Sequence, residues 1–344
     1  KSLNEQFGVS FSAQYSHSNI DIISSPGAAL LPPNAPDIYG QNGRLNYSGW
    51  SPLGYFYPFS NLLQPYESGT DFLNSSLDLS FEIAKGLTLK SNIGYSKMVS
   101  DQTNLQTIAA QDPIYNPTGT AYFGNTFIRN LIIEPQIIYN TFIGKNKISA
   151  IAGASMQSNE TVGLQIVGSG YNNDVLLASV NAAPVKFSST NKGEYKYAAM
   201  FARVNYNFKN KYIINLNARR DGSSRFGPGS QYGNFGSIGS AWIFSEESWI
   251  KRRLSFLSFG KIRGSYGLTG GDQISDYSYL SQWPFPGSTL YSGIVPLIVT
   301  RHTDSLLQWQ KNKKLEISLS IGLFKERVSI EVNWYRHRCD NQLV

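Results

Sequence analysis

The sequence predicts an all-β protein, a transmembrane antiparallel β-barrel, and three observations carry that prediction. Runs of alternating apolar and polar residues recur between Asn4 and Tyr335, and each is long enough to cross a bilayer as a tilted strand. Short polar turns alternate with long loops rich in Gly, Asn, Tyr and Pro, which is typical of outer-membrane barrels. The chain has 21 Tyr and 19 Phe in 344 residues, enough to supply the aromatic girdles of such a barrel.

Composition argues against other classes of protein. Hydrophobic residues make up 41% of the chain, but no stretch approaches the ~18 consecutive apolar residues of a helical membrane span. Charged residues make up 15%, below the roughly 25% typical of soluble domains. The net charge of +7 comes from scattered Lys and Arg, so we expect no nucleic acid partner but a polar lumen and contacts with the anionic head groups of outer-membrane lipids. A single cysteine, Cys339, excludes an intrachain disulfide framework within this stretch.

The first expected strand is followed by a long loop. Between Phe7 and Tyr15, apolar residues alternate with Gly, Ser and Gln, which is the pattern of a strand with one apolar face. Seven prolines then fall between Pro26 and Pro65. Because proline cannot donate to a ladder, residues 25–70 are expected to form a loop.

Two hairpins are expected next. The first turns at Lys85 and Gly86, between alternating runs that begin at Leu77 and end at Tyr95. The second turns at Lys145 and Asn146. Its expected apolar face contains Ile128, Ile132 and Ile138 before the turn, and Ile148, Ala150, Ala152 and Ala154 after it.

A third hairpin, which turns at Lys209 and Asn210, indicates what the polar faces of the strands meet. Apolar residues such as Val204 and Leu216 alternate with Arg203 and other charged or amide side chains. A charged face cannot line the dry core of a β-sandwich, so we expect these residues to face a water-filled lumen.

The last strands complete a count of about 11. Residues 238–244 and 262–268 flank a turn at residues 245–247, and a final hairpin turns at Lys325 and Glu326. Arginine in place of Leu319, on the apolar face, should be destabilising, and arginine in place of Ser318 should be tolerated. Because barrels of this kind keep short turns in the periplasm, the long loops are expected to be extracellular. These are residues 25–70, 99–125, 159–193, 222–233 and 270–310.

An odd number of strands is unusual for a bacterial barrel made from one chain. Eleven strands would leave two unpaired edges in lipid, where each unsatisfied backbone group costs several kcal/mol. We therefore expect this stretch to be part of a larger barrel.

Several strings in the second half of the sequence carry a family resemblance. Residues 220–227 read RDGSSRFG, and the later strings, in order, are SEE at 245–247, KIRGSYGLTG at 261–270, LQW at 307–309 and DNQL at 340–343. Together they resemble the SusC/RagA family of TonB-dependent outer-membrane transporters of the Bacteroidetes, most closely from about Tyr195 onward. Gly271 and Gln310 stand where the family usually has Asn and often has Glu.

The resemblance implies both a fold and a function. Family barrels have 22 strands, so residues 1–344 would be part of a TonB-dependent receptor β-barrel domain, with the plug domain and N-terminal extension not present in this stretch. The family also implies a multi-pass protein of the bacterial outer membrane. Such a protein imports large nutrients, glycan or peptide, beneath a SusD-like surface lipoprotein and is energised by the TonB complex through the plug.

No catalytic or metal-binding constellation is visible in the sequence. His17, His302 and His337 lie on separate elements, and none has the spacing of a metal site. Nucleotide-binding and hydrolase motifs are absent as well. We therefore expect no enzymatic activity, no metal and no cofactor.

Aromatic residues in the long loops are the candidates for substrate binding, because aromatic faces stack on sugar rings and peptide side chains and can anchor a lid protein. The candidates are Trp50, Tyr55, Tyr57, Trp283 and Tyr291, and the alternative is that they pack within their own loops. The inward cations, which could steer an anionic solute or pair with plug carboxylates, are Arg203, Arg219, Lys261 and Arg263. In the string at 220–227, the Asp, Gly and Ser residues favour a turn, with Arg225 paired to a neighbouring carboxylate, and the alternative is that the string contacts a ligand.

Two other classes of function are compatible with the alternating pattern. A passive, porin-like pore would need an open polar lumen without a plug. A surface β-adhesin would show the same alternation, but residues 315–323 would then expose a continuous apolar stripe to water.

Overall fold

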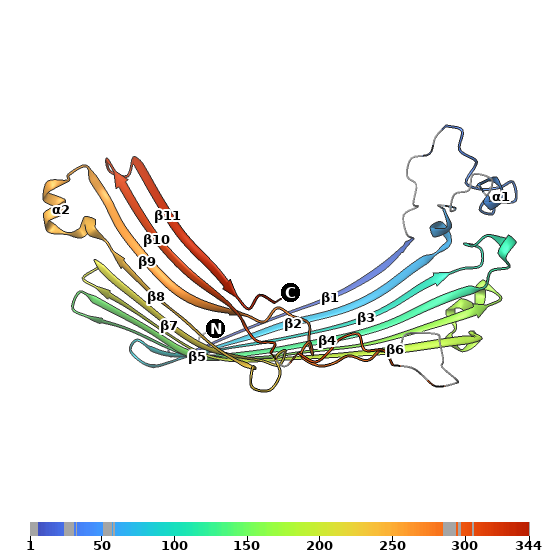
Figure 1. The fold of residues 1–344 in the computed structure, drawn as a ribbon, viewed down its shortest axis with the longest axis horizontal. Coiled ribbons are helices and arrows are strands. Elements are labelled where there is room, and N and C mark those ends of the chain that lie inside the picture. The colour runs from blue at the N-terminus through green and yellow to red at the C-terminus, as the bar shows by residue number, and fades with distance from the viewer. Residues whose placement is uncertain are drawn as a thin grey trace.

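The computed structural model describes residues 6–23, 31, 33–50, 57, 59–284, 294, 297–304 and 306–343. Within them, eleven strands form one antiparallel sheet in which each strand pairs with its neighbours in sequence (Figure 1). The strands are β1 Phe7–Ile23, β2 Pro65–Ala84, β3 Leu87–Gln106, β4 Gly119–Ile143, β5 Asn146–Tyr171, β6 Val185–Phe208, β7 Tyr212–Ser223, β8 Tyr232–Trp242, β9 Leu257–Gly271, β10 Gln310–Leu323 and β11 Val328–Asp340. The predicted all-β class and the strand count are confirmed.

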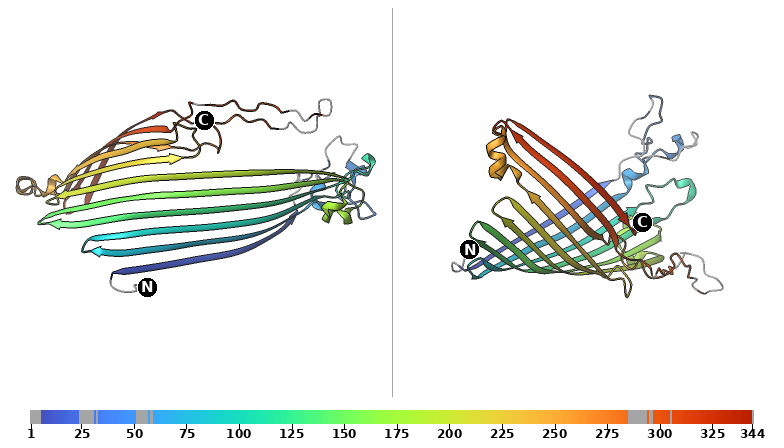
Figure 2. Two further views of the ribbon diagram at one scale, coloured as in Figure 1. Left: turned by 90° about the horizontal axis from the view of Figure 1, so that it is seen from below. Right: turned by 60° about the vertical axis from the view of Figure 1, so that its left-hand side comes forward.

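The sheet is bent into an open trough. Figure 1 shows β9, β10 and β11 rising from the floor of the trough, and Figure 2 shows the long strands β1–β6 beside the shorter strands β7–β11. Among the described residues, β1 and β11 each have a partner strand on one side only. The curvature is that of a barrel wall, and both of its edges are available for further strands.

Tight turns join the strands at one end of the sheet, which we call the turn end. Lys209 and Asn210 have φ of 53° and 56°, as expected for a two-residue hairpin turn of type I′. The first predicted turn is also confirmed: Gly86 has a φ of +80°, and an added Cβ there would lie 2.1 Å from the carbonyl oxygen of Asn140. The second turn lies one residue earlier than predicted, because Gly144 takes the left-handed backbone conformation and Asn146 already belongs to β5.

Short helices occupy the other connections. At the turn end, η6 Phe244–Glu246 and α2 Ser248–Arg253 join β8 to β9. At the opposite end, which we call the loop end, lie α1 Tyr47–Trp50, η2 Ser60–Leu63, η3 Pro113–Tyr115, η4 Asp174–Ala178 and η5 Val180–Ala182. In the part of the chain that the structure describes, no helix has the length and apolar character to cross a membrane.

The strand register gathers apolar side chains on one face of the sheet. Leu319, for example, lies beside Ile262 on one side and Val332 on the other. The apolar face includes Val9, Leu79, Ile93, Ile133, Ala152, Val204, Leu216, Ile238, Ile262, Leu319 and Val332. The polar face includes Ser10, Asp78, Asn92, Glu134, Ser149, Asn205, Asn215, Ser265 and Glu316.

The predicted phase of β4 is wrong. Ile132 pairs with Gly94 and lies on the polar face, as do Ile128 and Ile138, whereas Ile133 pairs with Ile93 on the apolar face. The residues around Ile132 are apolar at three consecutive positions, 131–133, so alternation does not reveal which of them faces outward. The neighbouring strand settles the phase, because Gly94 leaves room for the Ile132 side chain.

The strands are also longer than predicted, so the long loops are shorter. Strands β2–β6 contain 20, 20, 25, 26 and 24 residues, against 12, 11, 15, 14 and 13 in β7–β11. The loop predicted at 159–193, for instance, spans only residues 172–184. About 10 residues suffice to cross a bilayer, so the additional residues project beyond it, where water on both faces removes the need for alternation.

Buried side chains gather at the loop end rather than in the middle of the sheet. Three small clusters contain the most buried apolar residues: one in the loop before β2, one beneath η4 and η5, and one between β8 and the start of β10. Most side chains on the apolar face, such as Ile317 and Trp334, are instead about half exposed. A face of this kind must be covered by something other than the chain itself.

Candidate functional site

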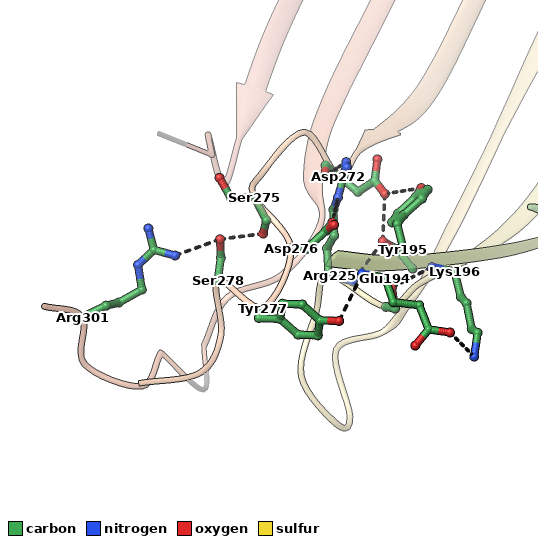
Figure 3. Close-up of polar contacts among 12 residues, drawn as sticks. Glu194, Tyr195, Lys196, Arg225, Asp272, Ser275, Asp276, Tyr277, Ser278 and Arg301 are labelled. Atoms are coloured by element: carbon green, nitrogen blue, oxygen red, sulfur yellow. Dashed lines mark hydrogen bonds and ion pairs between the residues drawn. The ribbon is translucent and has the colours of Figure 1, made fainter. Parts of the chain in front are cut away.

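A polar network holds the connection after β9 against the middle of β6 and the loop end of β7 (Figure 3). The carboxylate of Asp272 accepts hydrogen bonds from the hydroxyls of Tyr195 and Ser223, each at 2.8 Å. One carboxylate oxygen, Oδ2, accepts both of these bonds, so Asp272 joins β6 to the end of β7. We call Tyr195, Ser223, Arg225, Asp272 and Asp276 the clasp.

Arg225 makes the largest number of contacts in the clasp. Its Nε donates to Asp276 Oδ1 at 2.9 Å, and its Nη1 donates to the carbonyl oxygen of Asp272 at 3.2 Å. Its guanidinium also lies 4.2 Å from the centre of the Tyr195 ring, within the range of a cation–π contact. The predicted pairing of Arg225 with a carboxylate is confirmed.

The network continues into the loop after the clasp. The hydroxyl of Tyr277 accepts a hydrogen bond from the backbone N–H of Glu194 at 3.1 Å. Arg301 Nη1 donates to Ser278 Oγ at 3.1 Å, which links two segments of the same loop. The loop after β9 is therefore tied both to β6 and to itself.

An aromatic cluster packs next to the clasp. Phe226 is fully buried, and its ring centre lies 5.1 Å from that of Trp309, which lies 5.4 Å from that of Phe235. Trp309 Nε1 donates to the carbonyl oxygen of Gln231 at 3.1 Å. The RDGSSRFG string thus supplies a turn, a buried ring and an ion pair that position the loop after β9.

A hollow of about 650 Å³ lies on the polar face, where β7–β11 curl toward one another. Its polar-face side chains include Lys261, Arg263 and His337. Arg263 Nη2 lies 3.1 Å from Glu331 Oε1, and His337 Nε2 lies 3.5 Å from Glu316 Oε1. Charged groups of both signs therefore line this part of the face, as expected for a surface in contact with water.

The four predicted inward cations do lie on the polar face, but their partners differ. Arg219 Nε donates to Asp221 Oδ1 at 2.5 Å, and Arg263 pairs with Glu331. Within the described ranges, Arg203 and Lys261 have no ion-pair partner within 4.0 Å. These two cations remain available to a group outside this stretch.

Two of the aromatic candidates are buried, in keeping with the alternative that they pack within their own loop. Trp50 and Tyr57 each expose 7% of their surface, in a cluster with Tyr47 and Phe59. The Tyr57 hydroxyl donates to the carbonyl oxygen of Ile38 at 2.7 Å, and burial raises the pKa of Tyr57 to about 12. At neutral pH this hydroxyl stays protonated and fixes the fold of the loop.

The other aromatic candidates have different outcomes. Trp283 is 54% exposed, and its Nε1 donates to Ser281 Oγ at 3.0 Å. Tyr55 and Tyr291 lie outside the described residues. Sequence reasoning missed Tyr115, which is 81% exposed on η3, although Pro113 and Asn116 mark that turn clearly.

The three histidines occupy separate places. His17 lies on β1, with Nδ1 at 2.8 Å from Asp71 Oδ1, and His337 lies on β11. His302 lines a separate hollow of about 700 Å³ in the loop after β9. Over the described part of the chain, no three His, Cys, Asp or Glu side chains are placed to share a metal ion.

Comparison with known proteins gives a consistent result. The family model described as "TonB dependent receptor-like, beta-barrel" matches residues 10–344. The TonB-dependent receptor P39 of Formosa agariphila is 30% identical over 77% of this chain and 25% of its own length. The TonB-dependent receptor SusC of Bacteroides thetaiotaomicron is 24% identical over 92% of this chain and 34% of its own length.

The fold also matches that of a solved structure. The RagAB peptide importer in its closed-closed state superposes with a TM-score of 0.79 at 21% identity, covering 98% of this chain and 39% of the matched chain. The chain thus spans about a quarter to two fifths of the length of these relatives. The similarity extends over all eleven strands and concerns the fold.

Proposed function

This chain belongs to the TonB dependent receptor-like β-barrel family of the bacterial outer membrane, and from that premise we propose that the whole protein is an active importer. It takes up large nutrients, peptide or glycan, and TonB supplies the energy through a plug. A SusD-like surface lipoprotein covers the extracellular side. The observation that carries the proposal is a wall of eleven strands with one continuous apolar face and one charged face, in a chain related to SusC.

The larger barrel is part of the same proposal. Unpaired edges at β1 and β11 would cost several kcal/mol for each backbone group left unsatisfied in lipid, so we expect further strands on both sides. A total of 22 strands is in keeping with a chain that spans 39% of the matched RagAB chain. Residues 1–344 are then one part of the barrel domain, and the plug and the N-terminal extension lie outside them.

The polar face would line the transport path. Arg203 and Lys261 point inward without a partner in the described part of the chain, so they can pair with carboxylates of the plug. Residues at the loop end would meet the solute and the lipoprotein. The family consists of transporters and receptors rather than enzymes, so no catalytic role is proposed.

Trp283 is the aromatic candidate best placed to contact a solute. Its ring is half exposed on the loop that the clasp holds at the loop end. A flat ring in that position can stack on a sugar or on an aromatic or aliphatic peptide side chain. Peptide and glycan are both compatible with this contact, and uptake of each has to be measured.

Uptake by cells that carry the full-length protein tests the proposal. We expect labelled oligopeptide or oligosaccharide to enter only when the proton gradient is intact and TonB is present. Trp283→Ala should lower uptake about fivefold, the effect of losing ~1 kcal/mol of stacking. The matched control is Trp249→Ala, because Trp249 is 53% exposed on α2 at the turn end, against 54% for Trp283.

Two results would contradict this account. Uptake that persists after the gradient is collapsed would indicate a passive pore instead of an importer. Equal uptake by the Trp283→Ala and Trp249→Ala variants would remove Trp283 from the binding surface, while leaving the import mechanism intact.

A further inference from the structure

The apolar face ends at a clear boundary on the side of the loop end. On most strands the run of apolar residues stops at a charged or ionisable side chain on the same face. These boundary residues are His17, Asp71, Lys97, Arg129, Glu160, Lys196, Arg220, Lys313 and Arg336. Because the apolar face meets the hydrocarbon of the outer membrane, this boundary lies at the level of the lipid head groups.

The position of Arg129 agrees with that level. About 14 residues of β4 separate Arg129 from the end of the strand at Ile143. At a rise of ~3.3 Å per residue and a strand tilt of ~45°, these residues span about 33 Å along the membrane normal. The apolar band of such a barrel is about 25 Å tall. Arg129 therefore lies just outside the hydrocarbon, among the head groups.

The boundary is strongly basic from β3 to β7. Lys97 and Arg129 face each other directly across the β3–β4 ladder, an arrangement that is unfavourable unless an anion lies nearby. Arg129 Nη2 lies 2.5 Å from Glu160 Oε2, and Lys192 Nζ lies 3.7 Å from the other oxygen of the same carboxylate. Lys196 pairs with Glu194 at 2.7 Å. Together, five cations form what we call the basic patch: Lys97, Arg129, Lys192, Lys196 and Arg220. They outnumber the two carboxylates among them, Glu160 and Glu194.

An apolar groove of about 550 Å³ opens beside the basic patch on the same face. Leu131, Ile133, Met156 and Ala198 are among the side chains that line it. It lies at the step where the long β6 rises beyond the shorter β7, a step that is visible in Figure 2.

The end of the groove meets the basic patch. Tyr232 lines the groove, and the guanidinium of Arg220 lies 5.2 Å from the centre of its ring. Lys196 also lines the groove, and its side chain is 67% exposed. A molecule in the groove would therefore have an apolar part against Leu131 and Met156 and an anionic part beside Lys196 and Arg220.

We propose that the groove and the basic patch form a binding site for a phosphate-bearing glycolipid of the outer leaflet. One acyl chain lies in the groove, and phosphate groups are bound by the lysines and arginines at its end. Charge complementarity selects this occupant, because guanidinium and ammonium groups are the side chains that bind phosphate, and the cations outnumber the carboxylates around them. The site depends on the membrane location of the barrel and not on the solute that it imports.

Native mass spectrometry of the full-length protein in mild detergent tests the site, with bis-phosphorylated lipid A and its dephosphorylated form as probes. We expect the phosphorylated probe to bind about tenfold more tightly. The combined variant Arg129→Gln, Lys196→Gln and Arg220→Gln should lose that preference. The matched control is Lys251→Gln, Arg252→Gln and Arg253→Gln, which removes the same charge from α2 at the turn end and should leave binding unchanged.

Several outcomes would overturn the proposal. Equal binding of the two probes by the wild-type protein would indicate an acyl groove without head-group recognition. Unchanged preference in the patch variant would show that these cations do not bind phosphate. If the patch variant does not fold, the salt dependence of the wild-type protein decides: binding of the phosphorylated probe must weaken as salt is raised, and binding that is independent of salt contradicts the site.

Discussion

Leu319→Arg is expected to destabilise the folded barrel by about 2–4 kcal/mol, the cost of a cation at mid-depth on a lipid-facing strand. Leu319 lies near the middle of β10, between Ile262 and Val332 on the apolar face. The arginine side chain cannot reach water from there without displacing its neighbours. Equilibrium unfolding of the full-length protein in lipid vesicles measures the loss.

The control is Ser320→Arg, one residue further along the same strand. Ser320 lies on the polar face between Lys261 and Glu331, so an arginine there meets water, one lysine and one carboxylate. Ser318, which the sequence suggested for this purpose, is a poorer choice because it is only 4% exposed and its Oγ has no hydrogen-bond partner among the described residues. Equal losses for the Leu319 and Ser320 variants would contradict the assignment of the two faces.

Arg225→Ala is expected to release the loop after β9 from the clasp. The substitution removes hydrogen bonds to Asp276 and to the Asp272 carbonyl, together with the contact to the Tyr195 ring. Arg225 is 26% exposed, so these contacts are partly shielded from solvent, and we expect a local loss of about 2–3 kcal/mol. Hydrogen exchange of residues 272–283 measures this loss directly.

Arg301→Ala provides the comparison in the same loop. Arg301 is exposed and donates one hydrogen bond, to Ser278, so its removal should change exchange by less than about 0.5 kcal/mol. If the two variants accelerate exchange equally, the clasp does not hold the loop, and the order of this region has another source.

Alternation predicts the fold only where the two faces of a strand meet different surroundings. At β10, Ile317 and Leu319 face the apolar side and Ser318 and Ser320 the polar side, and the structure follows this pattern. In β4 the apolar residues 131–133 are consecutive, so the phase depends on packing against Gly94 of the neighbouring strand. Residues 188–194 in the outer part of β6 carry no apolar side chain on either face, so the sequence shows no period there although the backbone continues as a strand.

The candidate site was predictable in part. The RDGSSRFG string identified a turn and the ion pair of Arg225, because both depend on neighbouring residues and simple charge pairing.

The burial of Trp50 and Tyr57 was not predictable. It depends on contacts with Phe59 and other residues of a loop without periodicity, which no local pattern reveals. The basic patch was likewise invisible, because Lys97, Arg129 and Lys196 are far apart in sequence and meet only through the register.

A cysteine scan of β10 in the full-length protein tests the central claim most directly, namely that these strands separate lipid from an aqueous lumen. Cys339, the only cysteine of this stretch, is replaced by serine, and single cysteines at positions 315–321 are labelled with a fluorophore in vesicles. We expect lipid-attached quenchers to act at 315, 317, 319 and 321 and aqueous iodide to act at 316 and 320, with little quenching of either kind at 318, because Ser318 is only 4% exposed. Iodide quenching of equal strength along the whole series would show that water reaches both faces, and the barrel wall would be ruled out.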